Sequence, residues 1–185
     1  MSKGVIGCGV LGALLLLLVG TAIGSHNRLV ELDEDVEHAW SEAQDVYQRR
    51  ADLAFDLTAI VEGAADRETL ASVVEALGKV SQVDLKTAPD ANQLRQFEAA
   101  QQEVSDALGR LQAGLRPDLD VTEGKSPRQL QVRLEGVEER IAAERERFND
   151  ATLAYNKTRR RFPTVLLAFV TGLRDRPYFE SGVGR

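Results

Sequence analysis

The clearest pattern in this chain is an apolar stripe that starts at Leu29 and repeats at alternating spacings of three and four residues. It consists of Leu29, Leu32, Val36, Ala39, Ala43, Val46, Leu53, Leu57, Ile60 and Ala64. Arg50 is the polar residue in this register, and Trp40, Tyr47 and Phe55 widen the face that we expect to be buried. The pattern predicts a long helix that packs lengthwise against other helices, as in coiled coils.

Three further helices are predicted, over residues 68–86, 91–115 and 126–162. The first two are separated by Pro89. Apolar stripes lie on each, and the last comprises Leu130, Leu134, Val137, Ile141, Phe148, Ala151, Tyr155 and Phe162. No segment alternates with a period of two. The predicted fold class is therefore all-α, an antiparallel four-helix bundle with long first and last helices.

The last predicted helix has a clear start signal. Ser126 is a capping residue, Pro127 suits the first helical position, and Gln129 completes a capping box. The bundle is expected to span residues 26–162.

Residues 4–25 carry no charge, with five leucines at their centre. At 1.5 Å per residue they reach about 30 Å, the thickness of a bilayer core. We expect a single-pass transmembrane anchor over residues 1–25, because helix-forming sequence resumes directly at Asn27. A cleaved signal peptide ending at Gly24 is the alternative. A lipoprotein is disfavoured because Cys8 precedes the apolar core.

The residues flanking this segment indicate its orientation. Lys3 and the α-amino group precede it and Arg28 follows it, which favours a domain outside the cytoplasmic membrane. Gly20 and Gly24 form a GxxxG pattern that lets membrane helices approach closely, so a homo-oligomer is a hypothesis.

The charge balance excludes some partners. The formal net charge is −6, and since residues 1–24 contain one charged side chain, Lys3, the remainder carries −7. An acidic domain is a poor nucleic-acid binder and a poor match for anionic lipid over its whole surface. With one cysteine, Cys8, no intramolecular disulfide can form.

The sequence contains no complete catalytic or metal-binding pattern. His38 follows Asp35, and Glu135 precedes Glu138 by one turn, but a di-iron bundle site needs two Glu-x-x-His units. Hydrolase triads and phosphate-binding Gly-rich loops are missing as well. We expect no catalytic residue, no metal and no cofactor.

Arg50 needs a partner if its position in the stripe is buried. Glu144 occupies the corresponding stripe of the last helix. We therefore predict an Arg50–Glu144 pair that fixes the register of two antiparallel helices.

The last predicted helix ends in a basic cluster, Lys157, Arg159, Arg160 and Arg161. A short apolar segment follows, with Val165, Leu166, Leu167 and Phe169, in a region that we set apart as residues 163–185. It is too short to span a bilayer. The antiparallel order returns it to the membrane, where it could lie in the interface. The alternative, which general burial trends favour, is that it caps the open end of the bundle.

Several motifs resemble the signature of the LemA family of bacterial membrane-anchored helical proteins. At the front they include Ala39-Trp40 and Arg49-Arg50-x-Asp52-Leu53. At the back they include Leu134-Glu-Gly136, Phe148-Asn-Asp150, Tyr155-Asn156, Arg161-Phe-Pro163 and Arg176-Pro-Tyr-Phe179. Residues 54–56, Ala-Phe-Asp, replace a proline-containing stretch of the family, so the first helix should run on without a kink.

The resemblance implies a single-pass inner-membrane protein with no catalytic residues, linked in some relatives to magnetosome membranes. The predicted function is a non-enzymatic scaffold that binds unidentified protein partners and membrane lipid through its anchor. The alternative is a lipid-contacting, membrane-remodelling module that uses its basic and apolar C-terminal segment.

Overall fold

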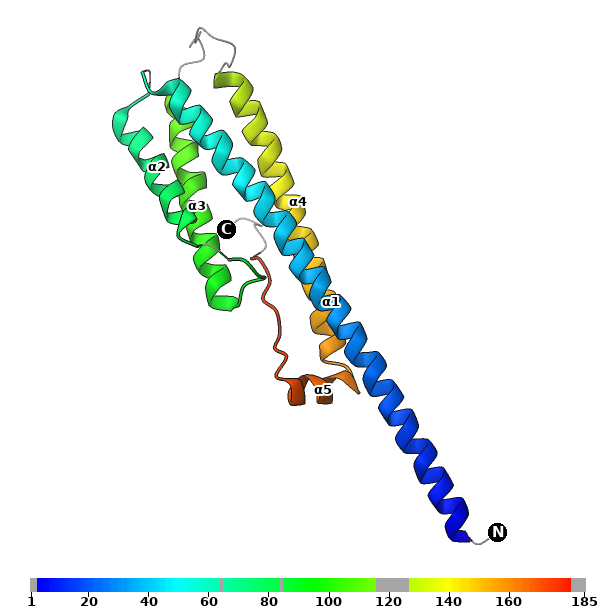
Figure 1. Ribbon diagram of the computed structural model, residues 1–185. Coiled ribbons are helices and arrows are strands. Elements are labelled where there is room, and N and C mark those ends of the chain that lie inside the picture. The colour runs from blue at the N-terminus through cyan, green and yellow to red at the C-terminus, as the bar shows by residue number, and fades with distance from the viewer. Residues whose placement is uncertain (1–2, 64, 84, 116–126, 181–185) are drawn as a thin grey trace.

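The computed structural model describes residues 3–63, 65–83, 85–115 and 127–180, and within these ranges it contains five helices and no strand. The helices are α1 (Lys3–Val61), α2 (Arg67–Ser81), α3 (Ala91–Gly114), α4 (Pro127–Arg159) and α5 (Thr164–Thr171). The first four alternate in direction, with α1 packed along α4 and α2 along α3 (Figure 1). The predicted all-α class is confirmed.

Helix α1 runs without interruption through 59 residues, about 90 Å at 1.5 Å per residue. Its bundle part begins at Leu29, the first residue of its stripe to be buried, whereas Leu16, Leu17 and Ile23 are exposed. It passes unbroken through residues 54–56, as predicted from the absence of a proline there.

Within the described residues, none of the helices combines the length and the apolar character needed to cross a membrane. The span predicted at residues 4–25 includes residues 4–11, 13–15, 18 and 19, whose side chains lie outside the described set. The transmembrane anchor therefore stays a prediction.

The core has two apolar clusters. The cluster nearer the N-terminal end of the bundle is aromatic and is built around Trp40, Phe97 and Phe148. The other is aliphatic and contains Leu57 and Leu108. Each draws on α1, α3 and α4, which is why the stripes of these helices predicted most of its members.

Two aromatic residues placed in the predicted buried faces are in fact exposed. Phe55 is 50% exposed beside α2, and Phe162 is 75% exposed beyond the end of α4. Ala54 is buried in place of Phe55. The stripe of α1 turns slightly relative to its neighbours, as a 3.6-residue helix does against a strict heptad repeat.

Helix α2 ends at Ser81, five residues before the predicted end at Lys86. The following residues enter the core instead of continuing the helix, with Leu85 9% exposed. Trp40 Nε1 and Gln44 Nε2 both donate to the Leu85 carbonyl, at 3.2 and 2.6 Å. Side chains of α1 thereby satisfy the carbonyl of this non-helical segment, which could not pair with residue 89 because Pro89 has no N–H.

The starts of α3 and α4 agree with the sequence. Asp90 caps α3 and forms a capping box with Gln93. Helix α4 begins at Pro127 as predicted, while its predicted cap Ser126 lies outside the described residues.

The chain reverses after α5 and returns into the bundle. Gly172 has φ +73°, a left-handed conformation that suits glycine at the end of a helix. Residues 172–180, which we call the C-terminal strap, then run back along the bundle as an extended segment (Figure 1). Within the region set apart as residues 163–185, Thr164, Ala168 and Phe179 thus contribute to the core.

Candidate functional site

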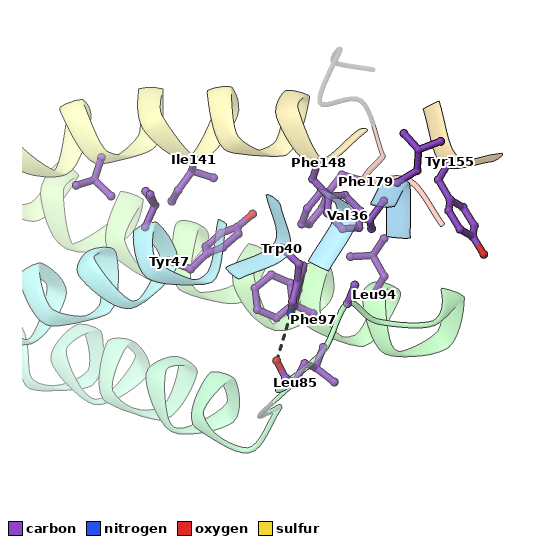
Figure 2. Close-up of a cluster of buried hydrophobic side chains, with 14 of the residues drawn as sticks. Val36, Trp40, Tyr47, Leu85, Leu94, Phe97, Ile141, Phe148, Tyr155 and Phe179 are labelled. Carbon is purple, nitrogen blue, oxygen red and sulfur yellow. Dashed lines mark hydrogen bonds between the residues drawn. The ribbon is translucent and has the colours of Figure 1, made fainter. Parts of the chain in front are cut away.

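The C-terminal strap ends in the aromatic cluster formed by Trp40, Phe97, Phe148 and Phe179 (Figure 2). The Phe179 ring is 2% exposed. Its centroid lies 5.2 Å from Phe148 and 6.1 Å from Trp40, and the Arg145 guanidinium lies 4.8 Å from the same ring. Edge-to-face and stacked contacts of this kind add to the burial of apolar area. The strap therefore supplies a central core side chain.

Two asparagines of α4, one heptad apart, hold the backbone of the strap. Asn156 Nδ2 donates to the Arg176 carbonyl at 2.8 Å, and its Oδ1 accepts from the Arg176 amide at 2.9 Å. Asn149 makes the same pair of bonds with Phe179, at 3.1 and 2.8 Å. The two side chains replace the partner strand that an extended segment otherwise needs. They fix the strap in register along α4.

Arg176 clamps the strap to α1 and to the loop between α2 and α3. Its guanidinium donates to Asp33 and Glu37 at 2.8 Å each and to the Ala88 carbonyl at 3.1 Å. Burial lowers the pKa of Arg176, but the hydrogen bonds and charges of Asp33 and Glu37 outweigh it and leave that pKa above its ordinary value. The Glu37 carboxylate also accepts from the Ala88 amide at 2.6 Å. One residue of the strap thus links three parts of the chain.

We expect Arg176→Gln to destabilise the protein by about 2 kcal/mol, because hydrogen bonds to charged groups are lost in a partly buried site. Urea unfolding followed by fluorescence of the chain's single tryptophan, Trp40, measures this. Arg174→Gln is the matched control, since Arg174 is exposed. Equal midpoints for the two variants would contradict the clamp.

Arg50 forms a second polar centre, between the aromatic and the aliphatic cluster. It is 2% exposed. Its guanidinium donates to Glu138 at 3.0 Å, to Ser105 Oγ at 2.8 Å and to both the side chain and the carbonyl of Gln101. The Tyr47 ring lies 5.3 Å away, and burial raises the pKa of its hydroxyl. Arg50 therefore joins α1, α3 and α4 at one level.

The predicted Arg50–Glu144 pair is wrong in its partner. Both side chains are buried, as the stripes indicated. Glu144 pairs instead with Arg147 on its own helix, at 2.7 Å, whereas Arg50 takes Glu138, six residues earlier on α4. The axial offset between two antiparallel helices decides this choice, and stripes on separate helices do not report it.

The predicted membrane-contact residues divide into two groups. Arg159 and Arg160 both bind Asp175, at 2.8 and 2.7 Å, and Arg159 also donates to the Leu173 carbonyl. Lys157 and Arg161 are exposed. Arg159 and Arg160 thus attach the strap to the end of α4, and a membrane contact of these two side chains stays a prediction.

Asp175→Asn should lower stability slightly at neutral pH, since water screens exposed pairs. The Arg160 hydrogen bond holds the pKa of Asp175 below its usual range. A depressed carboxyl pKa contributes stability above the unfolded-state pKa, and this contribution disappears as the pH falls through the folded-state pKa. The difference between variant and wild type should therefore vanish in acid. A urea series at stepped pH checks this, with the exposed Asp45→Asn as control.

Helix α5 places its apolar residues outward. Phe169 is 88% exposed, Val170 82%, Leu166 59% and Val165 40%. Thr164 and Ala168 are buried, and Leu167 is partly covered. The expected capping of the bundle thus uses the small side chains of α5, while most of the large ones face away.

In the described part of the chain no three histidine, cysteine or acidic side chains are grouped so as to hold a metal ion. His38 is exposed and lies 3.9 Å from Glu42. Glu138 is committed to Arg50, and Glu135 is exposed. A groove of about 580 Å³ beside the strap is lined by Asp33, Asn92 and Arg176 among others. The Asp33 carboxylate and the Arg176 guanidinium in this lining form an ion pair with each other.

Comparison with known proteins identifies the family. A model of the LemA family matches residues 39–184. The chain belongs to the LemA family. Magnetosome proteins MamQ 1 and MamQ 2 of Paramagnetospirillum magneticum and MamQ of Magnetospirillum gryphiswaldense are each 25% identical to it over 188 aligned positions. The alignments cover 90% of this chain and 69% of each relative.

The LemA-like motifs at the two ends of this chain meet in one place. Trp40 comes from the front motif, Phe148, Asn149 and Asn156 from α4, and Arg176 and Phe179 from the strap, and all lie at or next to the aromatic cluster. Sequence reasoning missed that the strap packs there. A signal was present, because Phe148-Asn149 and Tyr155-Asn156 repeat an aromatic-asparagine pair seven residues apart.

Proposed function

We propose that this LemA-family protein is a non-enzymatic scaffold, anchored in the bacterial inner membrane by residues 4–25, that presents its helical bundle to protein partners. The observation that carries the proposal is the continuity of α1 from Lys3 to Val61. An unbroken helix makes the uncharged segment and the bundle one rigid element. Partners bound to the bundle would be held at a set height above the bilayer.

Two further observations support this function. Three polar side chains at the centre of the fold are used within it, Arg50 and Arg176 as links between helices and Asn156 as a backbone partner for the strap. Relatives named magnetosome proteins support a role in membrane organisation.

Extraction of bacterial membranes with alkaline carbonate tests the anchor. The full-length protein should stay in the membrane pellet, because an uncharged helix of this length is stable in hydrocarbon. Leu16→Arg combined with Leu17→Arg should weaken membrane retention, since a charge near the centre of a span is costly. Glu31→Arg, just past the segment, is the control. Release of the wild-type protein would overturn the proposal.

Photo-crosslinking in cells tests the scaffold. A photoreactive residue at Phe55, Val74 or Val132, each more than 40% exposed on the bundle, should give discrete adducts that mass spectrometry identifies. Absence of adducts at all three positions, with the protein retained in membranes, would contradict a scaffold but leave the anchor intact.

Accessibility of a cysteine at Val132 to a membrane-impermeant reagent determines on which side of the membrane the domain lies. We propose that it lies outside.

A further inference from the structure

Helix α5 has the reverse of the burial pattern that is usual for a surface helix. A surface helix of a soluble domain buries its large apolar side chains and exposes its small polar ones. Helix α5 buries Thr164 and Ala168 and exposes Val165, Leu166, Phe169 and Val170, which lie at i, i+1, i+4 and i+5 on one side. We call these four residues, with the exposed Phe162, the outer face of α5.

The position of α5 points to what covers this face. It packs on α1 and α4 and lies across the end of the bundle from which the N-terminal part of α1 projects (Figure 1). On α1, Ala22 and Ser25 are partly covered and Leu29 is buried. Residues 22–25 lie about 11–16 Å along the helix from the middle of residues 4–25, and half of a hydrocarbon core is about 15 Å. The level at which α1 meets the bundle is thus the level of the bilayer boundary.

The charges around α5 fit a lipid headgroup layer. Residues 157–176 contain six basic side chains and one acidic one, in a chain with a formal net charge of −6. Three of the six, Arg159, Arg160 and Arg176, are paired with Asp175, Asp33 and Glu37. Lys157, Arg161 and Arg174 are exposed, and in the described part of the chain no ion pair involves them. Cations beside exposed leucine, valine and phenylalanine side chains are the pattern of an interfacial helix.

A protein partner fits this face less well. Stable interfaces use about 20–30 residues a side, whereas the outer face of α5 offers four side chains on one short helix and Phe162 just before it. The membrane requires no such area, because the anchor already holds the protein at its surface.

We propose that α5 lies in the interface of the bilayer that α1 crosses, with its outer face in the acyl boundary and Lys157, Arg161 and Arg174 among the headgroups. This inference rests on the proposed anchor. It gives the domain a second contact with the membrane, so the bundle is fixed in tilt and rotation as well as in height.

Site-directed fluorescence in proteoliposomes tests the inference with the full-length chain. Cys8 is replaced by serine, and a single cysteine carrying a polarity-sensitive dye is placed at Phe169, at the exposed Val132 of α4 or at Leu16. Vesicles contain phosphatidylcholine and phosphatidylglycerol, with or without a lipid that carries a nitroxide quencher at a shallow acyl position. Iodide serves as the aqueous quencher.

The dye at Phe169 should lose most of its emission to the lipid quencher and be protected from iodide, whereas the dye at Val132 should behave in the opposite way. Equal iodide quenching at Phe169 and Val132 would overturn the inference. Protection at Phe169 from both quenchers would also overturn it, because a protein would then cover the face. The dye at Leu16 separates the two proposals, since iodide quenching at Leu16 would mean that the anchor has failed.

A second variant tests the cations without disturbing the fold. Lys157→Gln combined with Arg161→Gln should reduce lipid quenching at Phe169 in vesicles with phosphatidylglycerol and leave it unchanged in neutral vesicles. An equal reduction in both kinds of vesicle would contradict the assigned role of these side chains.

Discussion

Phe179→Ala is expected to destabilise the protein by about 3–5 kcal/mol, the range measured for truncation of a fully buried aromatic ring. Phe179 contacts Trp40, Phe97 and Phe148, which belong to three different helices. Its removal leaves a cavity that the neighbouring rings can fill only in part. It also leaves the Arg145 guanidinium without the ring that it covers.

The unfolding free energy can be measured in urea by the fluorescence of Trp40, which stacks on Phe179 and reports directly on its loss. Phe55→Ala is the matched control, because that ring is 50% exposed and remote from the strap. Its truncation should cost about 1 kcal/mol, from the lost burial of half a ring. A Phe179→Ala value no larger than the control would mean that the strap does not enter the core.

Arg50→Ala is expected to cost about 3 kcal/mol, because removal of one member of a buried polar centre leaves its partners unsatisfied. The Gln101 side-chain oxygen loses its donor inside the bundle, whereas the Gln101 carbonyl keeps the Ser105 hydroxyl. Glu138, 45% exposed on its side chain, can turn to water. Arg50→Lys should recover little of the loss, since an ammonium group cannot reach several partners in the planar arrangement of a guanidinium. The exposed Arg49→Ala should change stability by less than about 0.5 kcal/mol.

A pair of double-mutant cycles distinguishes the observed partner of Arg50 from the one that sequence suggested. Arg50 and Glu138 should show a coupling of about 1 kcal/mol. Arg50 and Glu144 have no common partner among the described residues and should be additive within about 0.5 kcal/mol. The reverse order of the two couplings would restore the original pair and contradict the observed register of α1 and α4.

The sequence predicted those features that depend on one helix at a time. The spacing of Leu29 to Leu57 identified the buried face of α1, and Pro127 marked the start of α4. The sequence did not predict features that depend on the axial offset between neighbouring elements. The partner of Arg50 is one example. The early end of α2 is another, because Leu85 then packs against α1 and accepts from Trp40 and Gln44.

The C-terminal strap shows a second reason why the sequence predicted only part of the fold. Residues 172–180 form neither a helix nor a strand, so no periodicity marks them, and their extended backbone is satisfied by two side chains of α4. The apolar residues of α5 were noticed in the sequence, but the usual burial of such residues favoured a cap on the bundle. The structure places the large ones outward, with Phe169 88% exposed.

The position of the LemA-like motifs explains why they indicate an architecture and not a reaction. Trp40, Asn156, Arg176 and Phe179 fasten the strap to the bundle, and the strap in turn returns from α5. The motifs thereby determine where α5 lies relative to α1. In the proposed function this is the device that orients the bundle on the membrane.

In the proposed function α1 is one rigid helix that carries residues 4–25 in the bilayer and the bundle at its surface. Spin labels at Leu16, Ile23 and Val30, spaced about 10 Å apart along the helix, test it in proteoliposomes by their relative accessibility to oxygen and to a water-soluble nickel chelate. We expect Leu16 to lie deep in hydrocarbon, Ile23 near its boundary and Val30 in the aqueous phase or headgroup layer. Equal access of the nickel chelate to all three positions would contradict it.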